Sequence, residues 1–172
     1  MDRTAGRDEA ADQDHSGAPT RPVVRQEQVR ACGDCAICCK LIPISGDDID
    51  CAADEWCRHA RPGRPEGGCS IWAERPEQCR AYVCAWAQGI LPEEMHPRKA
   101  RLMVGTVDHP HWGLGWWIYE LNEGAMRTKH GAKLWEWLRT REETIPFAVC
   151  TGTRWTLYDR LGRLLYRGGS VG

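Results

Sequence analysis

The sequence predicts an α+β fold in which a loop-rich cysteine half packs on a small β-sheet with one or two helices. Nine of the ten cysteines fall between positions 32 and 84, in a stretch that glycine and proline interrupt repeatedly. After about residue 100 the pattern changes to the apolar and polar alternation that is typical of β-strands. One amphipathic segment in this second part has the apolar spacing of an α-helix.

The length and composition favour one domain preceded by a tail. A chain of 172 residues has room for one modest core. Residues 1–27 are polar and show no apolar periodicity, so we expect a disordered N-terminal tail. The remaining residues, 28–172, are predicted to form a single domain with a cysteine half at 28–90 and an α+β half at 91–172.

The second half supplies the predicted sheet and helix. Residues 101–107 and 115–121 alternate like paired strands, and a turn-rich segment separates them. Residues 132–143 are expected to be helical, with Leu134, Trp135 and Leu138 on one side. Three further short strands are expected at residues 146–150, 155–158 and 163–166. A hairpin turn at residues 159–162 should join the last two of them.

Charge and hydropathy exclude several classes of function. The formal net charge is −1, which gives no electrostatic basis for bulk nucleic-acid binding. No run of about eighteen apolar residues is present, so no membrane-spanning helix is expected. The N-terminus lacks a secretory signal pattern, which favours a cytoplasmic protein whose thiols remain reduced. The sequence therefore favours metal binding over disulfides as the purpose of the clustered cysteines.

The first cysteine run admits more than one metal. Cys32, Cys35 and Cys38 have the spacing of three ligands in a [4Fe-4S] loop, whose fourth ligand comes from a distant cysteine. Cys39 follows at once, which departs from the ferredoxin pattern. A Cys-x2-Cys pair serves equally well as half of a tetrahedral Zn²⁺ site. The spacing leaves the choice between an iron–sulfur cluster and Zn²⁺ open.

A second run of cysteines supplies the other predicted ligands. We expect a helix from Pro76 to about Ala87, on which Cys79 and Cys84 lie about 140° apart around the axis. Unless that helix breaks, these two thiols either serve two centres or include only one ligand. His59 is a further candidate because it lies two residues from a cysteine. The candidate metal ligands are Cys32, Cys35, Cys38, Cys39, Cys57, Cys69, Cys79 and Cys84, with His59 in addition.

Other notable residues are expected to be structural. Cys51 and Cys150 lie outside the two runs and are predicted to be small buried side chains. Arg75 and Arg80 are predicted to be ion-pairing or capping residues, although a positive charge beside thiolates would also lower the thiol pKa. The tryptophans are expected to lie in the core.

The two runs together resemble a known family. Cys32-x2-Cys35-x2-Cys38-Cys39, the later Trp56-Cys57-x-His59 and the segment from Gly68 to Trp86 occur in the order found in the CxxCxxCC cysteine-cluster proteins, the YkgJ-like zinc- or iron-chelating domains of bacteria. The resemblance implies a metal-chelating domain. A similar motif in flagellin lysine methylases, which use an iron–sulfur cluster, favours iron, although this chain is short for such an enzyme and lacks a glycine-rich S-adenosylmethionine loop.

Three functions remain open from the sequence. The first is a metal-binding accessory or redox-sensing protein that holds an iron–sulfur cluster or Zn²⁺. The second is a cluster-dependent modification enzyme of the flagellin lysine methylase type. The third is a zinc module that binds another molecule. No catalytic Ser–His–Asp set, phosphate loop or acid pair is recognisable, so the sequence names neither catalytic residues nor a protein or small-molecule partner.

Overall fold

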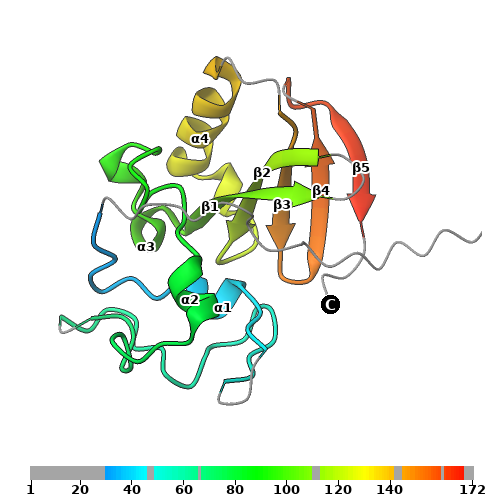
Figure 1. Cartoon of the computed structure of the whole chain (residues 1–172). Helices are drawn as coiled ribbons and strands as arrows, with labels where there is room; N and C mark the ends of the chain where they lie inside the picture. Colours follow the sequence, from blue (N-terminus) through cyan, green and yellow to red (C-terminus); the bar gives the residue numbers. More distant parts are fainter. Residues whose placement is uncertain are drawn as a thin grey trace, which may run out of the picture.

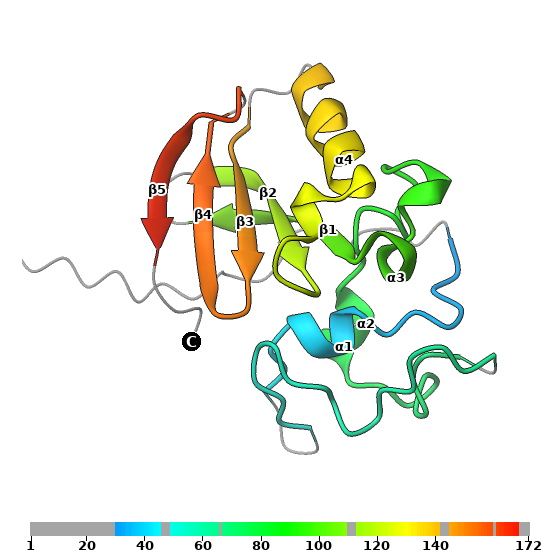
Figure 2. The same cartoon turned by 180° about the vertical axis from the view of Figure 1, so that it is seen from behind.

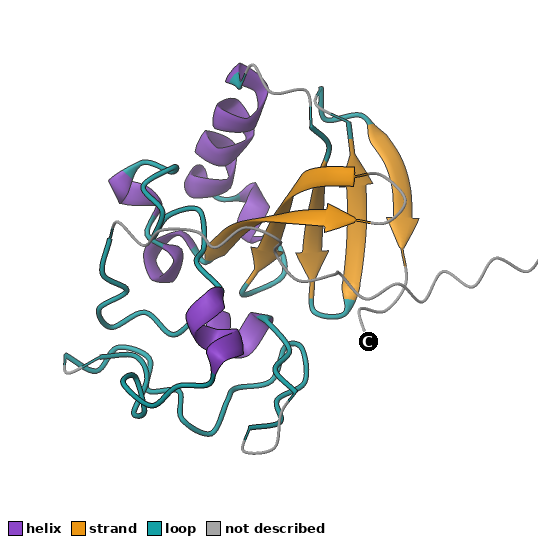
Figure 3. Ribbon diagram, viewed as in Figure 1, coloured by secondary structure: helices purple, strands orange, loops and turns teal. Residues whose placement is uncertain are grey.

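The computed structural model describes residues 30–45, 49–65, 67–109, 113–141, 145–159 and 161–168. A cysteine half made mostly of loops lies beside one end of a five-stranded sheet, as Figures 1 and 3 show. The tail predicted at residues 1–27 lies outside the described residues. Within these described ranges, no helix has the length and apolar character needed to cross a membrane.

The sheet is mixed and its strands follow sequence order. β1 (Leu102–His109), β2 (Gly113–Glu120), β3 (Phe147–Thr151), β4 (Arg154–Tyr158) and β5 (Leu164–Gly168) are neighbours in that order. The β1–β2, β3–β4 and β4–β5 pairs are antiparallel, and β2 pairs with β3 in parallel. The α+β class and both predicted antiparallel pairs are therefore confirmed. The parallel pair follows from the helix between β2 and β3, which returns the chain to the end of the sheet where β2 began.

The long helix of the second half is displaced from its predicted range. α4 (Lys129–Thr140) begins three residues before the expected start at residue 132. Thr128 caps it, because its hydroxyl oxygen accepts a hydrogen bond from the Gly131 N–H at 3.3 Å. The helix ends at Thr140, since Arg141 has an extended backbone. Leu134 and Leu138 are buried in the core against the sheet, and the partly buried Trp135 packs on the same core, as expected for three side chains on one side of the helix.

The two faces of the sheet are covered differently. α4 lies over one face of the sheet. The view from behind in Figure 2 shows the cysteine half near β1, at one end of the molecule. On the α4 face, Trp116, Ile118 and Phe147 join one large apolar core. The opposite face carries Trp117 and Cys150 in a smaller core. The short elements η1 (Glu93–Met95), α3 (Pro97–Ala100) and η2 (Ala125–Arg127) complete the α4 side.

The helix predicted from Pro76 to about Ala87 is much shorter in the structure. α2 (Glu77–Ala81) ends after five residues, and Tyr82 is extended at φ −89° and ψ 121°. Beyond it, the Ala85 N–H donates a hydrogen bond to the Val104 carbonyl oxygen of β1 at 2.7 Å. Val83 and Ala85 are buried in the α4-side core. The chain leaves the helix early because pairing with the edge strand and burying these apolar side chains require an extended backbone.

Tyr82 connects the cysteine half to the sheet. Its hydroxyl is buried and has no hydrogen-bond partner among the described residues. A Cβ atom at Gly105 would lie only 2.9 Å from this hydroxyl oxygen. Gly105 therefore leaves the space on β1 into which the Tyr82 side chain fits.

We predict that Gly105→Ala destabilises the protein by about 1–3 kcal/mol, because the new methyl group overlaps the Tyr82 hydroxyl. Tyr82→Phe alone should be neutral or stabilising, since it removes a buried hydroxyl without a described partner. The double variant should then recover part of the loss. Denaturant unfolding at one fixed metal content measures all three free energies, and strictly additive effects would contradict the proposed contact.

Candidate metal centre

The paired cysteines of the first run lie on a short helix. α1 (Cys38–Leu41) is closed by a hydrogen bond from the Ile42 N–H to the Cys38 carbonyl oxygen at 3.1 Å. Ile37 and Leu41 anchor it in an apolar cluster with residues of the sheet. Consecutive residues of a helix are about 100° apart around its axis, so Cys38 and Cys39 leave the helix in different directions. Their sulfurs nevertheless remain close enough to interact.

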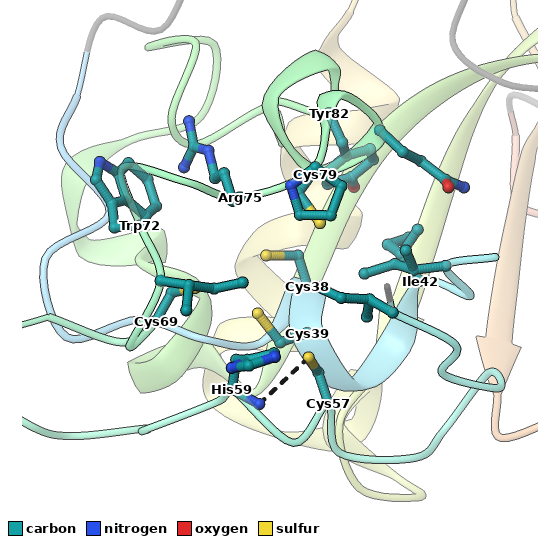
Figure 4. Close-up of a pocket in the computed structure, with 15 residues that line it drawn as sticks. Cys38, Cys39, Ile42, Cys57, His59, Cys69, Trp72, Arg75, Cys79 and Tyr82 are labelled. Carbon is teal, nitrogen blue, oxygen red and sulfur yellow. Dashed lines mark hydrogen bonds between the residues drawn. The ribbon is translucent and has the colours of Figure 1, made fainter. Parts of the chain in front are cut away.

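One cavity of about 60 Å³ lies on the Cys39 side. Figure 4 shows the side chains of Cys38, Cys39, Cys57 and Cys79 gathered around it, with His59 beside Cys57. The thiols that line it come from separate parts of the chain, namely α1, two loops and α2. They are Cys38, Cys39, Cys57, Cys69 and Cys79.

A second cavity of about 50 Å³ adjoins the first. Its lining thiols are Cys32, Cys35, Cys38, Cys79 and Cys84. Cys38 and Cys79 border both cavities, so the two spaces share a wall formed by α1 and α2. Each cavity exceeds the roughly 10–15 Å³ that one water molecule needs, so either can accept an ion.

The eight thiols fall into two interacting sets, and Cys39 connects the sets because it also raises the pKa of Cys32 and Cys38. Cys32, Cys35, Cys38 and Cys84 form one set, because Cys84 raises the pKa of Cys32 and Cys35, and both of these raise the pKa of Cys38. Cys39, Cys57, Cys69 and Cys79 form the other, because Cys39 and Cys57 raise the pKa of Cys69 and Cys79. We call these sets the Cys32 group and the Cys39 group.

The two groups meet at the doubled cysteine. The Cys38 thiol donates a hydrogen bond to the Cys39 sulfur, which raises the pKa of Cys38 and lowers that of Cys39. The end of α2 separates the groups on the other side, since Cys79 lies within the helix and Cys84 in the extended segment after it. Of the two sequence hypotheses for Cys79 and Cys84, this placement favours two centres.

Backbone contacts hold the loops of both groups together. The Cys57 N–H donates to the Cys39 carbonyl oxygen at 2.8 Å, which places both thiols on the same cavity. The Gly68 N–H donates to the Gly33 carbonyl oxygen at 3.0 Å. A Cβ atom at Gly68 would lie 2.3 Å from the Cys35 carbonyl oxygen, so only glycine allows this approach of the two loops.

Crowding and burial make most of these thiols weak acids. Burial is the largest cause and raises the pKa of Cys32 to about 11, of Cys35 to about 12 and of Cys79 to about 11. Neighbouring thiols add to each shift. A cation bound among them would remove this penalty, because metal binding and thiol deprotonation are coupled.

The remaining candidates are placed as follows. His59 lines the first cavity, its backbone N–H donates to the Cys57 sulfur at 3.5 Å, and its Nε2 accepts from Arg58 Nε at 3.2 Å. Cys51 and Cys150 are buried and line neither cavity, which confirms the prediction that they are buried side chains. In the described part of the chain, no group of three or more His, Cys, Asp or Glu side chains has the geometry of a formed metal site.

Sequence reasoning missed the role of Trp72 and Arg75 in the cavity walls. Both residues border both cavities. Trp72 was expected in the core, but it is 46% exposed and the Arg75 guanidinium carbon lies 3.5 Å from its ring centroid. The short spacing from Trp72 to Arg75 and on to Cys79 was the available signal.

Comparison with protein-family models, with curated proteins and with solved structures finds no match for this chain. The resemblance to the CxxCxxCC cysteine-cluster family therefore stays a prediction from the motif.

We predict that Cys150 resists alkylation in the folded protein. Burial raises its pKa well above the usual thiol range. Little thiolate therefore exists at about pH 8, and the reagent has no access to the sulfur. Peptide mass spectrometry after iodoacetamide treatment should find Cys150 unmodified until denaturant is added, whereas labelling as fast as in the unfolded chain would contradict its placement.

Proposed function

We propose that this protein binds metal through its two cysteine groups and serves as an accessory or redox-sensing protein. The observation that carries the proposal is that eight clustered cysteines line two adjoining cavities, five on each, with Cys38 and Cys79 bordering both. Four thiolates are a complete ligand set for Zn²⁺ or for an iron–sulfur cluster. Neither group needs a ligand from another molecule.

The weak structural support within the cysteine half also favours bound metal. Among the residues that the structure describes, the buried members of its own apolar cluster are Ile44, Ile49, Cys51 and Cys57. α1 and α2 are four and five residues long, too short to be stable alone. Metal coordination supplies folding energy in loop-rich domains of this kind. We therefore assign the metal a structural role in addition to any redox role.

The two groups favour different metals. The Cys32 group takes three thiols from one short loop and a fourth from Cys84, which is the ligand pattern of a [4Fe-4S] cluster. The Cys39 group takes its four thiols from four separate segments, an arrangement that suits one tetrahedral Zn²⁺ ion. His59 lines the cavity of the Cys39 group, and its imidazole could replace one of the four thiolates as a ligand. The cofactor is thus an iron–sulfur cluster, Zn²⁺ or one of each.

We predict that cysteine substitutions remove the two metals separately. Cys35→Ser should empty the Cys32 group and Cys69→Ser the Cys39 group, so each variant should lose the metal of one group and keep that of the other. Cys150→Ser is the matched control and should retain all of it, because Cys150 lies on the sheet and lines neither cavity. The measurement is elemental analysis of protein purified without oxygen.

Two results would count against this division. Wild-type protein with less than roughly half an equivalent of both iron and zinc would contradict metal binding itself. Equal and complete loss of metal in the Cys35 and Cys150 variants would contradict the ligand assignment. Limited proteolysis gives a second readout, since loss of metal should expose the loops of the cysteine half while the sheet stays resistant.

We predict that the Cys32 group holds iron when iron and sulfide are supplied without oxygen. The protein should then be brown and absorb near about 400 nm, which is typical of thiolate-bound clusters. Cys84→Ser should weaken this absorbance more than Cys57→Ser, since only Cys84 belongs to that group. A colourless protein with zinc and no acid-labile sulfide would establish the zinc alternative instead.

A further inference from the structure

We propose that Arg75 is a positioning residue that serves both metal centres, by donating a hydrogen bond to a metal-bound sulfur and by offsetting the negative charge of the thiolates. This inference rests on the proposed function and assigns a role to a residue that is not itself a ligand. Its basis is the place of Arg75 in the wall between the two cavities.

The position of Arg75 is fixed from two sides. Its guanidinium stacks on the Trp72 ring at 3.5 Å, as the close approach of the two side chains in Figure 4 shows. Its carbonyl oxygen accepts a hydrogen bond from Arg80 Nη1 at 2.8 Å. Pro76 follows directly and leads into α2, which carries Cys79. The arginine is therefore held in place rather than swinging freely in solvent.

One donor of this arginine has no acceptor. Arg75 Nε is buried and lacks a hydrogen-bond partner among the described residues. A buried N–H without a partner is costly, so such a group in a folded protein usually has a use. Sulfur atoms of a metal–thiolate centre accept hydrogen bonds of this kind. The cavities on either side of Arg75 are where such sulfurs would lie.

The charge of Arg75 also lies beside both groups, because this residue borders both cavities. No acidic side chain forms a salt bridge with it among the described residues. Its positive charge is therefore available to the thiolates of both groups.

Cobalt(II) is a suitable probe because it binds tetrahedrally to four thiolates, as Zn²⁺ does. Its sulfur-to-metal charge-transfer bands then report on the bound thiolates. The experiment compares wild-type protein with Arg75→Gln and Arg75→Lys, each loaded with Co²⁺ without oxygen. Arg64→Gln is the matched control. It removes the same charge from the same half, but Arg64 is exposed and borders neither of the two cavities that Arg75 borders; it meets Cys69 only at a separate surface cavity.

We expect Arg75→Gln to shift the charge-transfer band to longer wavelength, because a thiolate without its hydrogen bond gives up electron density more easily. Transfer of the metal to a chelator should become about 10–100-fold more favourable, as is typical when a partner of a metal ligand is removed. Arg75→Lys should shift the band as well but retain more of the affinity, since it keeps the charge and loses the planar donor. Arg64→Gln should match wild type.

The outcomes separate this inference from the proposed function. Wild-type protein that takes up no cobalt overturns both. Wild-type protein that takes up cobalt while the Arg75 variants keep its band position and affinity overturns the role of Arg75 alone. An equal effect in Arg64→Gln also overturns it, because bulk charge would then explain the change. If Arg75→Gln fails to fold, an unshifted band in Arg75→Lys has the same meaning.

Discussion

The hydrogen bond between the Ala85 N–H and the Val104 carbonyl oxygen is the constraint on which the cysteine half depends. It ties the segment after α2 to β1, which is an edge strand of the sheet. An edge strand presents unpaired backbone groups, and this contact satisfies one of them. It also places Cys84 at the boundary between the rigid sheet and the cysteine loops. Together with the burial of Val83 and Ala85, it fixes the end of α2 and one wall of the second cavity.

The α+β half could be predicted largely from local patterns. Alternation identified β1 and β2, and Asp159 accepts backbone hydrogen bonds at the turn before β5, as its type and position suggested. The start of α4 was missed because the cap at Thr128 lies before the apolar stripe that was used to find the helix. The parallel pairing of β2 with β3 was missed because it depends on how α4 packs, which no local pattern contains.

The sequence predicted which cysteines line the candidate site, but not which of them lie next to one another. The spacing of Cys32, Cys35 and Cys38 identified three thiols of one loop, and burial of Cys51 and Cys150 agrees with their exclusion. The partners of that loop were not predictable, because the early end of α2 at Ala81 decides which cavity Cys84 faces. That end is set by packing of Val83 and Ala85 against the sheet, a long-range effect. Arg75 was recognised as a cation near thiols, but its place between two cavities required the fold.

The adjacent Cys38 and Cys39 couple the two proposed centres electrostatically. Cys38 and Cys39 are joined by one peptide bond and by a hydrogen bond between their sulfurs, so ionising one affects the other. Four thiolates around a divalent cation retain a net negative charge, which would oppose loading of the neighbouring group across a short, largely apolar wall. A cation fixed in that wall reduces this repulsion for both groups at once. Arg75, which stacks on Trp72 and borders both cavities, is in a position to meet this requirement under its proposed role.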